Sequence, residues 1–327
     1  MSERLRRFAS WDTAVILVTV VVLVIASFGV ENFGTSRNFT FLLLDLLPIA
    51  LVALPMTFVI VTGEIDLSVA STLGLTSAVM GSLWDKGMTI ESIIPLCIVL
   101  GAVLGALNGF FVTVLKLPSL AVTIGTLALY RGLAFVVLGD GAVADFPREY
   151  TSWVTGTLGD GPIPNVLVPL IVLALVFGVV LHATPVGRGV FAAGAGEQAA
   201  RFAGIRTGRV KFWLYVVSGA VAGLAGVLWT LRYSSARADN GFGVELAVVA
   251  AVLLGGVSIF GGKGTLPGVL AGVVLLATLQ NALRLQDVSN EALNIVTGVL
   301  LIVSVLLPNI VSAALRRRRP RAVSPER

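Results

Sequence analysis

The chain has 327 residues, of which 56% are hydrophobic and only 13% are charged. Average soluble domains carry about 25% charged residues, and a surface built from half that share would expose large apolar patches to water. The composition therefore excludes an ordinary soluble protein and indicates one that lies in a lipid bilayer. The net charge of +5 does not indicate nucleic-acid binding, because the basic residues gather at the termini and in one loop.

Apolar segments of about 20 residues, the length that crosses a membrane, recur along the whole chain. The tract from Val244 to Phe260 is short and bounded by glycines, which indicates a broken or partly re-entrant helix. We predict an all-α, polytopic membrane helix bundle of about ten transmembrane helices, with spans at 12–30, 41–61, 66–84, 92–115, 120–138, 164–182, 212–231, 245–260, 266–284 and 292–311.

Lysine and arginine are unevenly distributed between the two sides of this bundle. With a cytoplasmic N-terminus, 16 of the 23 basic residues fall in inner segments and six in outer segments. Because basic residues mark the cytoplasmic side, both termini are predicted to be cytoplasmic. The chain is then a single domain, 1–327, with a membrane bundle at about 12–311, a basic inner loop at 183–211 and a basic tail at 312–327.

Glycines spaced four residues apart predict close contacts between helices, because small residues let two backbones approach. Gly101, Gly105 and Gly109 fall on one helix face, and the pairs Gly219–Gly223 and Gly268–Gly272 repeat the spacing.

Residues for catalysis or metal binding are scarce. The chain has one cysteine, Cys97, and one histidine, His182, so the usual zinc sites and an intrachain disulfide are excluded. The stretch Gly261–Thr265 lacks the spacing and the Ser or Thr after the lysine that a phosphate-binding loop needs. We expect no enzyme activity, no cofactor and no metal.

Five polar residues are candidates for a translocation pathway or gate. Arg131 lies deep in an apolar tract, where an arginine costs about 2.5–3.5 kcal/mol unless it faces the bundle interior, water or a partner. One interpretation places Arg131 in the wall of the pathway or in an ion pair that forms a gate, with Asp45 as a candidate partner. The other interpretation is a structural salt bridge. Capping of the next helix is sufficient to explain Asp66. The side chain of Glu64, in contrast, could face the pathway or a cytoplasmic partner. The full candidate set is Glu64, Asp66, Asn108, Arg131 and Asn281.

Within the inner loop, Glu197 to Phe202 has the pattern of a short amphipathic helix closed by Gly204. Such a helix along the membrane surface suits docking into a groove of a soluble protein. A solvated connector with inner-side charge fits the same residues, and the sequence pattern alone leaves both interpretations open.

Three stretches resemble the import permeases of ATP-binding-cassette (ABC) transporters, in the ribose/simple-sugar branch. They are the loop residues Gly196, Glu197, Ala199, Ala200 and Gly204, the segment from Thr62 to Ser71, and the segment from Leu254 to Gly264. The similarity extends over about residues 40–310. Glu64 departs from the pattern, since many relatives have glycine there. Tyr130-Arg131-Gly132 and Leu138-Gly139-Asp140 make rhamnose-type and autoinducer-2-type permeases the most similar.

The resemblance implies a permease subunit in the bacterial plasma membrane that forms the pathway for a monosaccharide or an autoinducer-2-like molecule. It implies that Gly196, Glu197, Ala199, Ala200 and Gly204 couple to a pair of cytoplasmic ABC ATPase subunits, which bind the ATP. It also implies a second permease subunit, identical or homologous, and an extracytoplasmic sugar-binding protein. The alternative is a secondary transporter driven by an ion gradient, but that class typically needs midplane carboxylates that this chain does not clearly offer.

Overall fold

The computed structural model describes residues 11–317, and the side chains of residues 11–306. Arg4, Arg6, Arg7 and residues 318–327, which belong to the predicted basic ends of the chain, lie outside the described residues. All ten predicted apolar segments form helices, so the all-α fold is confirmed. These helices are α2 (Trp11–Gly29), α3 (Ser36–Val61), α4 (Val69–Asp85), α5 (Ile90–Thr113), α6 (Ser119–Leu138), α8 (Leu167–Ala183), α11 (Thr207–Tyr233), α12 (Val244–Leu254), α13 (Leu266–Arg284) and α14 (Asn290–Arg317).

Six of the described helices, α2, α3, α5, α6, α11 and α13, are long and apolar enough to cross a membrane. A seventh crossing is available if α8 and α9 (Pro185–Ala195), which meet at a bend of 66°, are taken as one span. The other four predicted spans form shorter helical segments, since α4 and α8 have 17 residues each, α12 has 11, and the described apolar part of α14 is Asn290–Leu306. The structure thus establishes a polytopic membrane protein, and the count of about ten crossings stays a prediction.

Two predicted loops contain further secondary structure. The loop at 139–163 holds β1 (Ala142–Val143) and α7 (Arg148–Thr155), and β1 pairs antiparallel with β2 (Ala236–Arg237). The basic loop at 183–211 holds α9 and then α10 (Glu197–Phe202). The predicted short helix is therefore confirmed at both of its ends, whereas α9 was not expected.

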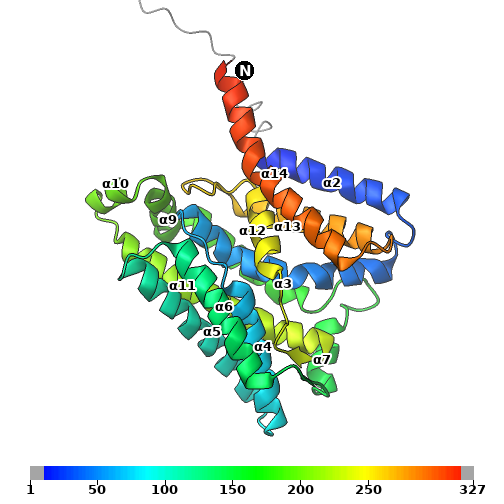
Figure 1. The fold of residues 1–327 in the computed structure, drawn as a ribbon. Coiled ribbons are helices and arrows are strands. Elements are labelled where there is room, and N and C mark those ends of the chain that lie inside the picture. Colours follow the sequence, from blue (N-terminus) through cyan, green and yellow to red (C-terminus); the bar gives the residue numbers. More distant parts are fainter. Residues whose placement is uncertain (1–10, 318–327) are drawn as a thin grey trace, which may run out of the picture.

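Helix α3 lies in the middle of the bundle, between two groups of helices (Figure 1). On one side α4, α5, α6 and α11 pack together, and on the other α2, α12, α13 and α14 do so. Almost all of the apolar part of α3 is buried, which fits a helix surrounded by protein rather than by lipid.

A proline in α3 creates a specific need for a hydrogen-bond donor. Pro48 has no backbone N–H, so the carbonyl of Leu44, one turn earlier, loses its usual partner within the helix. Arg232, in the last turn of α11, donates from Nη1 to this carbonyl and from Nη2 to the carboxylate of Asp45. One guanidinium thus satisfies the broken turn and joins α11 to α3.

The glycine faces are close helix contacts, as predicted. Gly101 and Gly219 face each other, and a Cβ on either would lie closer to the carbonyl oxygen of the other than real Cβ atoms approach. Gly105 is pressed against the carbonyl of Tyr215 in the same way. The α5–α11 contact therefore depends on the missing side chains.

The links between helices gather at two ends of the bundle. At one end, called the α10 end, the amide of Gly262 donates to the carbonyl of Val61, and the amide of Leu266 donates to Nε2 of His182. At the other, called the α7 end, Thr40 donates to the carbonyl of Pro162, and β1 meets β2. His182 thus caps the start of α13, which is a structural role.

Candidate coupling site

Helix α10 has a defined beginning and end in the sequence. Gly196 precedes it, and its last turn closes with a Schellman motif, in which the amide of Gly204 donates to the carbonyl of Arg201 and the amide of Ile205 to that of Ala200. The motif needs a left-handed residue after the helix, and Gly204 has φ +86°. Glycine at position 204 therefore stops the helix at the observed place.

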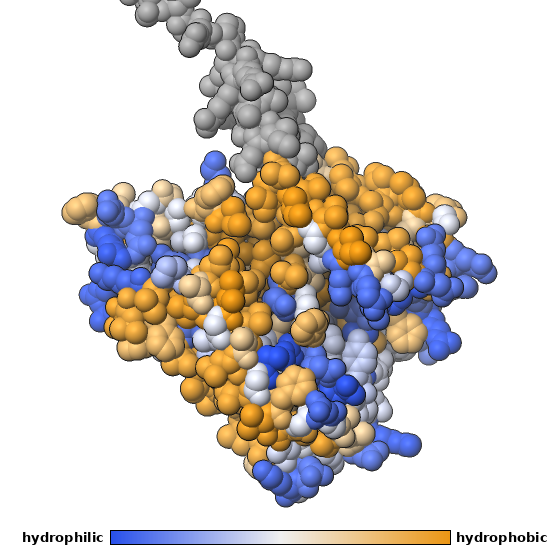
Figure 2. Space-filling view, viewed as in Figure 1, coloured by the Kyte–Doolittle hydropathy of each residue, from blue (hydrophilic) through white to orange (hydrophobic). Residues whose placement is uncertain are grey.

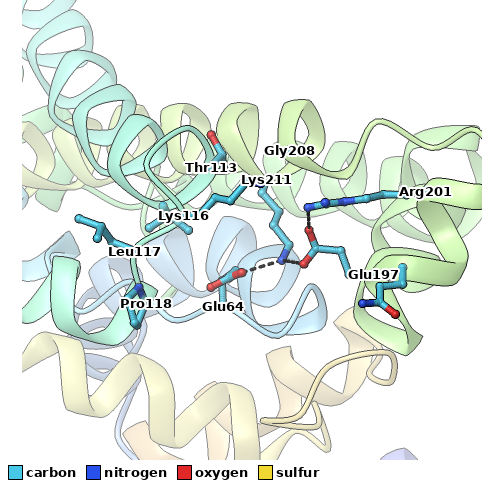
Figure 3. Close-up of a pocket in the computed structure, with 11 residues that line it drawn as sticks. Glu64, Thr113, Lys116, Leu117, Pro118, Glu197, Arg201, Gly208 and Lys211 are labelled. Carbon is cyan, nitrogen blue, oxygen red and sulfur yellow. Dashed lines mark hydrogen bonds and ion pairs between the residues drawn. The ribbon is translucent and has the colours of Figure 1, made fainter.

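A lysine from α11 attaches α10 to the bundle. Nζ of Lys211 lies 2.8 Å from Oε2 of Glu197 and 2.6 Å from Oε1 of Glu64, which is in the link between α3 and α4 (Figure 3). The lysine side chain is only 8% exposed, so the pair is poorly screened by solvent. One ammonium thus joins α10 and α11 to the link between α3 and α4, which lies 147 residues from Lys211 in the sequence.

Glu197 has two further partners, Arg201 in the last turn of α10 and Thr207 at the start of α11. Arg201 forms an ion pair with its Oε1, and Thr207 donates to the same oxygen at 3.2 Å. The hydrogen bond from Lys211 is the main cause that lowers the pKa of Glu197 below its ordinary value. Glu197 is therefore a carboxylate at neutral pH, held by two cations and a hydroxyl.

These side chains line an open, charged cavity of about 520 Å³ at the α10 end (Figure 3). Its wall is completed by the link between α5 and α6, including Lys116 and Pro118. A cavity with both signs of charge beside a short surface helix is suited to contact with a polar protein surface rather than with lipid.

The opposite side of α10 faces solvent. Phe202 is 93% exposed, and Ala199 is exposed as well, whereas Ala200 is buried against the bundle. An aromatic residue so fully exposed beside charged neighbours is a feature of protein contact surfaces. Of the predicted coupling residues, Ala199 and Gly204 are exposed on this surface, and Glu197 and Ala200 attach the helix.

The link between α3 and α4 continues from Glu64 into a buried polar cluster. Asp66 is 1% exposed and accepts hydrogen bonds from the amide and hydroxyl of Ser68 and from the hydroxyl of Ser218. Asn108 donates from Nδ2 to Ser68 at 2.7 Å. Asp66 and Asn108 are thus brought together, with Asp66 two residues after Glu64 in the chain.

The two other candidate pathway residues lie apart from this cluster. Arg131 donates to the carbonyls of Ala238 and Asn240, so its guanidinium holds the β2–α12 link, and no ion pair of Arg131 occurs in the described part of the chain. Asp45, which was one candidate partner for Arg131, pairs instead with Arg232 and Arg284. Asn281 exchanges hydrogen bonds with Asn38 of α3.

Sequence reasoning did not single out Lys211 or Arg232. Lys211 lies in the second turn of α11 and Arg232 in its last turn, and a basic residue near a helix end serves as an ordinary orientation signal. Glu64, a partner of Lys211, and Asp45, a partner of Arg232, lie 147 and 187 residues away in the sequence, so no local spacing marks these two contacts.

A bundle of apolar helices with a charged surface helix at one end has the form of a membrane permease. The family model for the branched-chain amino acid transport system / permease component matches residues 38–305, and the chain belongs to this family. It is a multi-pass protein of the bacterial plasma membrane.

Two relatives match over nearly their whole length. The chain is 33% identical to the ribose import permease protein RbsC of Haemophilus influenzae over 296 residues, which is 90% of this chain and 91% of the relative. It is 34% identical to the autoinducer 2 import system permease protein LsrD of Yersinia enterocolitica over 310 residues, 92% of each chain. No solved structure matches. These relatives support an ABC sugar-import permease and not the secondary transporter.

Proposed function

We propose that the chain is the permease subunit of an ABC importer for a ribose-like or autoinducer-2-like molecule, and that α10 is the helix through which a separate ATPase moves it. The observation that carries this function is the attachment of α10. An exposed, well-terminated helix presents Phe202 outward while Lys211 ties its inner side to α11 and to the α3–α4 link.

The proposed arrangement has about ten crossings, both termini and the α10 end in the cytoplasm, and the α7 end outside. The domain is single, 1–327, with the bundle at about 12–311. A pair of ABC ATPase subunits binds α10, and a second permease, identical or homologous, completes the pathway. An extracytoplasmic sugar-binding protein delivers the substrate at the α7 end. No site in the described part of the chain suggests that this subunit hydrolyses ATP itself.

The substrate class is tested in the bacterium that carries this chain. Deletion of the gene should abolish uptake of a labelled monosaccharide such as D-ribose and leave uptake of labelled leucine unchanged. The leucine arm matters because the family model is described by branched-chain amino acid transport. Lost leucine uptake with normal uptake of sugars would contradict the proposed substrate class.

The docking role of α10 is tested by purification of the chain from its native membrane with the ATPase. Phe202→Ala should reduce the amount of ATPase retained, because it removes the most exposed aromatic side chain of α10. The matched control is Trp153→Ala, which removes a 49% exposed aromatic residue from α7 at the other end. Equal retention by the two variants would contradict the docking assignment.

A further inference from the structure

Two cavities open at the α7 end and meet at one ionic bridge. The α14 cavity, of about 660 Å³, lies between α11, α12, α13 and α14. The α3 cavity, of about 610 Å³, lies beside the start of α3 and is lined by residues that include Arg37, Thr40 and Phe41. Asp45, Arg232 and Arg284 line both cavities. The carboxylate of Asp45, bound by both arginines, therefore stands between them.

The lining of the α14 cavity is unusual for this bundle. Amides from Gln280, Asn290 and Asn294 face it together with the aromatic rings of Trp229 and Phe242. Figure 2 shows hydrophilic residues in the middle of the face that it draws, next to mainly hydrophobic surface. A surface in contact with lipid would not keep amides there, because a polar group in hydrocarbon without a partner costs several kcal/mol.

The charges of the α14 cavity balance. Arg232 and Arg284 are paired with Asp45, and Glu245 is the one further carboxylate among its described lining residues. Amides and a carboxylate donate to and accept from hydroxyl groups, and aromatic faces cover the apolar C–H face of a sugar ring. Cavities of about 300–1,000 Å³ hold small molecules. This combination suits a small, uncharged polyhydroxyl compound better than an ion.

We propose that the α14 cavity is a binding station for a monosaccharide on the outer part of the pathway, closed toward the α3 cavity by the Asp45–Arg232–Arg284 bridge. The proposal rests on the proposed function, which places the α7 end outside. Glu245, Gln280 and Asn294 bind the hydroxyl groups, and Trp229 and Phe242 bind the ring face. Of the candidate pathway residues, only Asn281 lines this cavity.

The chain is well suited to a labelling test, because its single cysteine, Cys97, is wholly buried. Asn294→Cys places a thiol in the cavity. Ile295→Cys, on the adjacent position of α14, is the matched control, since Ile295 is 68% exposed and does not line the cavity. Whole cells carrying each variant are treated from outside with a charged, membrane-impermeant methanethiosulfonate, with and without millimolar D-ribose.

The expected result is fast modification at Asn294→Cys, slowed by D-ribose, and slow modification at Ile295→Cys with or without sugar. Equal rates at the two positions, or no protection by D-ribose, would overturn the sugar station. Uptake of labelled D-ribose by the untreated parent is measured alongside. If the parent takes up labelled D-ribose normally but the labelling rates do not follow the expected pattern, only the sugar station is ruled out. If uptake of D-ribose is unaffected by deletion of the gene, the proposed function is ruled out.

Discussion

Nζ of Lys211 and Oε1 of Glu64 lie 2.6 Å apart, although 147 residues separate them in the sequence. Because the same ammonium also binds Glu197, movement of α10 acts directly on the link between α3 and α4. That link continues into the buried cluster around Asp66, which contacts α5 through Asn108 and α11 through Ser218. The ion pair thus connects the surface helix with the interior of the bundle.

Lys211→Met should leave two carboxylates facing each other without their shared cation. Removing one partner of a buried pair costs about 3–5 kcal/mol, and the partial exposure of Glu197 places this case at or below the lower value. We expect a lower thermal unfolding midpoint in nanodiscs and a higher ratio of ATP hydrolysed to sugar imported. Lys211→Arg, which keeps the charge, is the control. An unchanged ratio in Lys211→Met would contradict a coupling role.

The attachment of α10 should be insensitive to pH near neutrality. Glu197 has an ordinary pKa of 4.5, which its partners lower in the folded protein. The unfolded chain then binds more protons between the two values, so this contribution is present above pH 4.5 and is lost as the pH falls through the folded pKa. The difference in unfolding midpoint between the parent and Glu197→Gln should be constant near neutrality and shrink in acid. A difference that grows in acid would show that Glu197 is not held as a carboxylate.

Gly204→Val should disturb the end of α10. A β-branched residue at φ +86° is strained, and the left-handed conformation costs L residues about 1–2 kcal/mol. We expect faster proteolysis between α10 and α11 and weaker retention of the ATPase. Gly204→Asn is the milder comparison, because asparagine tolerates this conformation better than valine. Equal effects of both substitutions would argue against backbone conformation as the cause.

Gly105→Ala should separate α5 from α11, because the new methyl group meets the backbone carbonyl of Tyr215, which cannot rotate away. Overpacking of this kind costs about 1–3 kcal/mol. Gly132→Ala on α6 is the matched control, since nothing lies within 4 Å of its added Cβ. Thermal unfolding of the two purified variants should show a lower unfolding midpoint for Gly105→Ala only. Similar decreases in the midpoint of both variants would refute the close contact.

The two arginines that bind Asp45 should differ in their importance for stability. Arg232 is 9% exposed and also satisfies the Leu44 carbonyl, so Arg232→Leu leaves that carbonyl without its donor and leaves Asp45 with the more exposed Arg284 as its ion-pair partner. We expect Arg232→Leu to lower the free energy of unfolding by about 3 kcal/mol. Arg284 is 52% exposed, and Arg284→Leu should cost under about 1 kcal/mol. Unfolding in guanidinium chloride measures both, and equal losses would contradict the role of the Pro48 break.

Local rules predicted the helices and the ends of α10 well, because apolar length, amphipathic pattern and a terminating glycine act within a few residues. The partners of charged residues could not be predicted in this way. Arg131 was expected to face the interior, but its acceptors are backbone carbonyls more than a hundred residues later, which no side-chain pattern reveals. Lys211 looked like any inner-side lysine until the fold brought Glu64 and Glu197 to it.

The central place of α3 bears on how the chain is made. This helix leaves the ribosome early, yet the helices that surround it in the finished protein include α11, α12 and α13, which are synthesised roughly 150 or more residues later. Until then α3 has α8 and α9 as its later-made protein neighbours but lacks α11, α12 and α13, and the turn at Pro48 lacks the guanidinium that completes it. Truncated chains that end before α11 should therefore remain attached to the insertase or be degraded.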